Sequence, residues 1–159
     1  LPESQLDRFM ICLSIGYPSV EDQVKILQVQ RYQNPLEELQ CIATPESLLE
    51  VQKYLSSVKA TEAILTYAAR LAQATREHPL VELGASPRAV LALVRMARAH
   101  AVLEERNYVT PEDIRSVFID VCAHRLVLRP QARIDGVHAA DVLTEILRNT
   151  LPDAEAGAR

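Results

Sequence analysis

Apolar residues recur at helical spacing through most of the chain, whereas strand-like runs are rare. Apolar side chains three or four positions apart predict amphipathic helices over residues 19–31, from Thr44, and over 61–78, 87–104, 110–122 and 137–150. Gly is scarce, with four residues, and Trp is absent, which also favours helices over a β-sandwich. The pattern therefore predicts an all-α fold, a bundle of four to five helices.

The spacing also predicts which side chains are buried. The expected inward residues are Ile64, Leu65, Ala68, Leu71, Ala72 and Thr75 over 61–78; Val90, Leu91, Val94, Ala97 and Ala101 over 87–104; Ile114, Val117, Phe118, Val121 and Cys122 over 110–122; and Leu143, Ile146 and Leu147 over 137–150.

Residues 9–15, FMICLSI, form the one good strand candidate, and the turn signal GYPS follows. Because no partner strand follows, we expect its sheet to lie upstream of Leu1. The chain begins without Met, so we expect a piece of a longer protein. The remaining segments are expected as a proline-started turn or short helix over 1–8, loops over 32–43 and 79–85, and a flexible tail over 153–159.

Three of the predicted helices begin with a Ser or Thr followed by Pro, which suit the N-cap and the first helical position. The helices at Thr44 and Thr110 carry Glu directly after the proline, whereas the helix at Ser86 carries Arg88. A helix start is electropositive, so a cation there costs roughly 0.3–1 kcal/mol. Ser86, Pro87 and Arg88 therefore suggest an anion-binding site, for which phosphate is a natural ligand.

Local pattern leaves simpler explanations open for two arginines. Arg88 can fold back on Glu82 or extend into solvent. Arg8, in the stretch QLDRF between the short helix and the strand, can pair with Asp7 or Glu3.

Several function classes lack their motifs. The loop GxxxxGK[ST], GxSxG, HExxH and an EF-hand are absent, and the four histidines are expected at the surface or at helix caps. Cys12, Cys41 and Cys122 lie far apart without zinc-ligand spacing, which fits a reducing cytoplasm and predicts no metal site. No apolar stretch approaches 18 residues. Binding of nucleic acid is disfavoured by a pI of about 5.6, despite three excess positive charges over 70–133.

Four clusters carry a family resemblance: LPESQLDRF from Leu1, GYPS from Gly16, ATREHP with LGASPRA between 74 and 89, and YVTPEDI with HRL between 108 and 126. Together they resemble the C-terminal part of MoxR-family AAA+ ATPases, over about residues 1–128. The magnesium-chelatase branch is a more distant likeness.

The resemblance implies that ATP and magnesium bind in an α/β core upstream of Leu1, next to a helical lid. It implies that residues 1–18 end the core, that 19–152 form the lid and that 153–159 are a tail. Arg88, with Ser86 and Pro87, matches the sensor-two position that reaches the γ-phosphate of ATP. Arg8 matches the arginine finger that is offered to the neighbouring subunit's nucleotide.

Family likeness also implies a homo-hexameric ring, partner proteins with von Willebrand factor A domains, and a role in remodelling protein complexes. The fragment itself is expected to bind ATP weakly and not to hydrolyse it. The alternative is an autonomous helical interaction module without nucleotide. One departure is Glu105, where the family has Gly; it predicts that the helix ends later, at Asn107.

Overall fold

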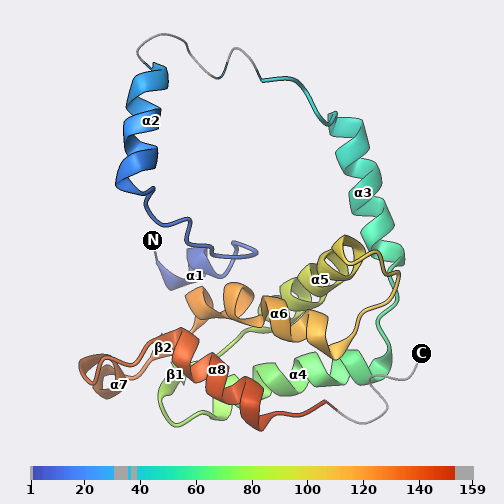
Figure 1. Cartoon of the computed structure of the whole chain (residues 1–159). Helices are drawn as coiled ribbons and strands as arrows, with labels where there is room; N and C mark the ends of the chain where they lie inside the picture. The colour runs from blue at the N-terminus through green and yellow to red at the C-terminus, as the bar shows by residue number, and fades with distance from the viewer. Residues whose placement is uncertain (1, 31–35, 37–38, 153–159) are drawn as a thin grey trace. The chain divides into compact units, whose positions relative to one another are not determined.

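The computed structural model describes residues 2–30, 36 and 39–152 of the chain (Figure 1). Its helices are α1 (Glu3–Leu6), α2 (Val20–Gln30), α3 (Pro45–Ser57), α4 (Glu62–Glu77), α5 (Pro87–Leu103), α6 (Pro111–Cys122), α7 (Pro130–Ile134) and α8 (Ala139–Asn149), with a 3-10 helix η2 (Ala123–Arg125). Its strands are β1 (Val81–Leu83) and β2 (Val127–Leu128). The predicted helical fold is confirmed. The expected tail and most of the expected loop over 32–43 lie outside the described residues.

The described chain divides into two units, Leu13–Gln52 and the remainder. In the smaller unit, Ser19 Oγ accepts a hydrogen bond from the Asp22 backbone N–H at 3.1 Å and so caps α2. Lys25 Nζ lies 3.0 Å from Asp22 Oδ1 within the same helix. The helix predicted over 19–31 therefore starts where expected.

The larger unit is built on α4, α5, α6 and α8, whose inward faces form one core. Figure 1 shows α5 beside α6, with α4 and α8 packed against them. All five inward residues predicted in α6 and all three in α8 are buried. The 16-residue α4 buries Ile64, Ala68, Leu71, Ala72 and Thr75, together with Tyr67, which the pattern did not select. Leu65 was also predicted to face inward, but it is 43% exposed, because it lies one position beyond Ile64 at the edge of the buried face.

The buried face of α5 differs from the prediction. Leu91 is 65% exposed, whereas Leu93 is 1% exposed, and Val90 and Val94 are only partly buried. The buried face is lined mainly by small side chains, namely Ala89, Ala92, Ala97 and Ala101. Small side chains on α5 let α6 approach closely. The face of α5 that is buried is therefore the one that packs best against α6, and not the one with the largest apolar side chains.

In the described chain, residues 9–15 do not form the predicted strand. Residues 79–85, predicted as a loop, contain a strand. Residues 9–15 have no ladder partner, and their backbone instead contacts the helices, for example through the hydrogen bond from Cys12 N–H to Asp120 O, 3.0 Å. A strand needs a neighbouring strand to satisfy its backbone groups. Instead, β1 lies within 79–85 and pairs antiparallel with β2 (Figure 1).

The C-terminus of α5 also differs from the prediction. The helix ends at Leu103, and Glu105 adopts a left-handed φ of 57°. Glu105 N–H donates to Val102 O at 2.9 Å, and Arg106 N–H donates to Ala101 O at 2.8 Å. These are the two bonds of a Schellman cap, so the turn forms here without the glycine, and the helix does not extend to Asn107.

None of the helices in the described residues is long and apolar enough to span a bilayer.

Candidate functional site

The start of α5 has the geometry that the sequence predicted. Ser86 is the N-cap, with Oγ accepting a hydrogen bond from the Ala89 backbone N–H at 3.2 Å, and Pro87 occupies the first helical position. The two helices that begin with Thr-Pro, α3 and α6, carry an acidic residue in the first turn, whereas α5 has none. The start of α5 is therefore ordered and lacks its own anion.

Arg88 lies near an anion that the local sequence did not identify. Its side chain is 58% exposed, and Nη1 lies 3.9 Å from Asp7 Oδ2. The contact is with Asp7 rather than with Glu82, which the sequence had offered as the alternative partner. The pair is long and solvent-exposed, so it holds Arg88 only weakly.

Asp7 is a shared acceptor at this site. Ser86 Oγ donates to its Oδ1 at 2.9 Å, and Arg125 Nε donates to the same oxygen at 3.2 Å. A carboxylate near the N-terminus of α5 also complements the helix dipole. Asp7 thus links the start of α5 to η2.

Arg125 is the main residue that sequence reasoning missed at this site. Its side chain is 2% exposed, and it lies on η2, directly after α6. It also hydrogen-bonds the backbone carbonyls of Phe9 and Met10, at 2.6 and 3.2 Å. The available signal was the HRL cluster, which carries part of the family resemblance.

Arg76, Asp7 and Arg125 line an open cavity of about 600 Å³ beside the start of α5, together with residues 82–87. Arg76 Nε donates to Ala85 O at 2.8 Å and fastens the segment before Ser86. Gly84 is required here, because an added Cβ would lie 2.7 Å from the backbone nitrogen of Arg76. The cavity thus combines a capped helix start with two guanidinium groups that are bound to neighbouring oxygens and with the carboxylates of Asp7 and Glu82.

Arg8 lies next to Asp7 in sequence but outside this network. Its side chain is exposed and makes no hydrogen bond or ion pair with the described residues. Asp7 therefore does not take the role of partner that the sequence had left open, and the side chain of Glu3 lies outside the described part of the structure. The structure brings the segment carrying Arg8 to the start of α5, because Asp7 contacts Ser86 and Arg88.

A second polar cluster surrounds Asp113 in the core. Arg106 Nη1 and Nη2 donate to its two oxygens at 2.7 and 2.6 Å, while Thr110 N–H and His100 Nδ1 also contact it at 2.7 Å. Burial raises the pKa of Asp113, but the hydrogen bonds from Arg106, Thr110 and His100 outweigh it and hold this pKa well below its usual range. His100 and Arg106 tie α6 to α5 and to the turn after it, and Thr110 caps α6 itself, so this cluster is structural.

Comparison with known proteins identifies the lid. The AAA lid domain matches residues 73–146. The chain is 38% identical to the uncharacterized protein YeaC of Bacillus subtilis, over 92% of this chain and 46% of YeaC. It is 34% identical to chaperone MoxR1 of Mycobacterium tuberculosis, over 98% of this chain and 44% of that protein.

The solved structures agree with this result. A crystal structure of a candidate ATPase from Cytophaga hutchinsonii superimposes with a TM-score of 0.86 and 30% identity, over 96% of this chain and 49% of that one. The chain thus spans about half the length of these relatives. It belongs to the MoxR family of AAA+ ATPases and corresponds to their C-terminal portion, which contains the AAA lid domain.

Proposed function

We propose that this chain is the lid portion of a MoxR-type ATPase and couples ATP binding and hydrolysis to the remodelling of protein complexes. The observation that carries the proposal is Arg88, an exposed guanidinium at a capped helix start whose nearest anion is 3.9 Å away. A terminal phosphate can replace Asp7 beside Arg88 at the start of α5, because the ion pair with Asp7 is weak.

In this proposal Arg88 is the sensor-two residue. Ser86 and Pro87 fix the start of α5, so the guanidinium and the helix dipole meet the γ-phosphate of ATP together. Charge spreads over the phosphate oxygens as the bond to the leaving group breaks, and a delocalised cation stabilises that charge. Release of phosphate then frees Arg88, so the lid senses the nucleotide state.

Arg8 is proposed as the arginine finger for the neighbouring subunit's ATP. Its exposure and its freedom from partners in the described chain are the features that such a role requires. A finger supplied in trans makes hydrolysis depend on assembly, which fits a homo-hexameric ring. The two arginines thus act on different nucleotides.

The remaining assignments follow the family. Residues 1–18 would end an α/β core, 19–152 would form the lid, and magnesium would be held by acidic residues of that core. Magnesium neutralises phosphate charge when bound, and the described residues of this chain contain no group of three or more His, Cys, Asp or Glu placed to hold it. Proteins with von Willebrand factor A domains are the proposed partners, in the cytoplasm.

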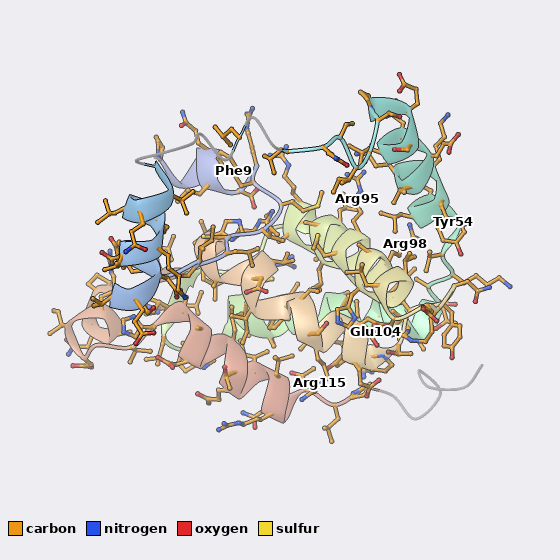
Figure 2. All side chains as sticks on the ribbon, turned by 45° about the horizontal axis from the view of Figure 1, so that its top comes forward. Phe9, Tyr54, Arg95, Arg98, Glu104 and Arg115 are labelled. Carbon is orange, nitrogen blue, oxygen red and sulfur yellow. The ribbon has the colours of Figure 1, made fainter. Side chains whose placement is uncertain are left out.

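The test compares two arginines of α5 in the complete ATPase, with the chain joined to its core. We expect Arg88→Ala to lower kcat by roughly 10²–10³-fold, the usual loss for one phosphate-stabilising donor. Arg95 lies two turns further along α5 and is also exposed, so Arg95→Ala is the matched control (Figure 2). Equal ATPase activity in both variants would refute the assignment of Arg88.

A further inference from the structure

We propose that Arg125 is a positioning residue for Arg8, so that the lid, rather than the core, sets where the arginine finger points. This inference rests on the proposed function and deepens it. It follows from how the residues on either side of Arg8 are held.

Arg125 uses its whole guanidinium on the segment around Arg8 and on α6. Nε donates to Asp7 Oδ1 at 3.2 Å, Nη1 donates to Met10 O at 3.2 Å and to Val121 O, and Nη2 donates to Asp7 O at 3.3 Å and Phe9 O at 2.6 Å. These contacts engage all five N–H donors that an arginine has. Lysine has three donors in a different geometry, so it cannot reproduce the arrangement.

Other contacts fasten the same segment to the same end of the bundle. His124 Nε2 lies 3.1 Å from Phe9 O, and Cys12 N–H donates to Asp120 O at 3.0 Å. Figure 2 shows Phe9 near α1, outside the packed helices. The backbone on both sides of Arg8 is thus tied down, while the Arg8 side chain stays exposed.

Asp7 connects the contacts made by Arg125 to Arg88, the proposed nucleotide sensor. The carboxylate that accepts from Arg125 also accepts from Ser86 and pairs with Arg88. When Arg88 binds phosphate, Asp7 loses one partner but keeps Arg125. The same carboxylate therefore contacts both Arg88 and the residue that holds the backbone beside Arg8.

The experiment mixes two variants of the complete ATPase. The donor carries Arg88→Ala, which disables its own site but leaves Arg8 available; the acceptor carries Arg8→Ala, which retains its own site. The mixture should recover ATPase activity at interfaces where a donor finger meets an acceptor site. Adding Arg125→Lys to the donor should lower the recovered kcat by about tenfold to a hundredfold with KM unchanged, because small misplacements of a catalytic group are costly.

Comparing the loss of recovered activity in the donor with that in the acceptor separates positioning of Arg8 from a general structural role of Arg125. The same Arg125→Lys placed in the acceptor should cause a loss at least tenfold smaller than in the donor. Arg129→Gln in the donor is the matched control, because Arg129 is an exposed arginine four residues further on. Hydrogen exchange should also show faster exchange of the amides of residues 8–12 with α4 and α8 unchanged.

The outcomes test separately whether Arg8 is the arginine finger and whether Arg125 positions it. No recovery in the first mixture would contradict Arg8 as a finger, and this inference with it. Recovery that survives Arg125→Lys in the donor, or that falls equally in donor and acceptor, would overturn the inference alone. If Arg125→Lys does not fold, a donor with Asp7→Asn, which keeps every backbone acceptor, carries the same prediction with a smaller loss.

Discussion

Arg88 and Asp7 form a long ion pair, with 3.9 Å between Nη1 and Oδ2, at the start of α5. Asp7 holds Arg125 much more closely, at 3.2 Å, and the Arg125 side chain is buried. One carboxylate therefore has a loosely held partner and a tightly held one. This difference makes Arg88 the partner that is free to bind another anion.

Unfolding measurements should reproduce that difference. Arg88→Ala should change the free energy of unfolding by less than about 0.5 kcal/mol, since an exposed cation is removed from an unfavourable helix end. Arg125→Ala should cost about 3–5 kcal/mol, because it breaks a buried pair and leaves several acceptors unmatched. Urea denaturation of both variants measures this, and equal losses would contradict the assignment of a loosely held Arg88.

Asp113 should make stability depend on acid pH. Its pKa in the folded chain is below the value of about 3.9 in the unfolded chain, so its contribution is fully present above that value and is lost as pH falls toward the folded pKa. Asp113→Asn should therefore cost about 3 kcal/mol at pH 7, and the difference from wild type should shrink below about pH 4.

Glu112→Gln is the control for Asp113, because Glu112 is the adjacent acidic residue and is exposed. It should leave the pH profile of unfolding unchanged. A loss from Asp113→Asn that stays constant between pH 7 and pH 3 would show that the low pKa is not the source.

Replacing Glu105 with glycine should stabilise the folded chain. Its φ of 57° is unfavourable for a residue with a Cβ, by roughly 1–2 kcal/mol, and glycine adopts it without that cost. Glu105→Gly should raise the melting temperature by about 2–4 °C. Glu104 has a φ of −89°, so Glu104→Gly should give no gain, and a gain there as large as at Glu105 would refute the strain argument.

The sequence was sufficient for elements that local chemistry decides. The cap at Ser86 and the buried faces of α6 and α8 follow from side-chain type and period, and they are confirmed. The face of α5 was partly wrong, because close packing on α6 selects alanines, which carry little weight in an apolar period.

The network around the candidate site depends on contacts that local pattern does not contain. Asp7 and Ser86 are 79 residues apart, and Asp7 and Arg125 are 118 apart. The sequence indicated that Arg88 needed an anion, but only the fold identifies the nearest one as a carboxylate. Glu105 was misjudged because the cap is held by backbone bonds, and these form even where glycine is absent.

The central claim is that Arg88 binds the γ-phosphate of ATP, and nucleotide affinity tests it most directly. ATP and ADP differ by that phosphate, so the measurement is the Kd of each nucleotide for the complete ATPase carrying Arg88→Ala. The account predicts at least about tenfold weaker ATP binding, the loss of one charge-assisted contact, with ADP binding nearly unchanged. Equal weakening of both nucleotides, or no change in either, would contradict it.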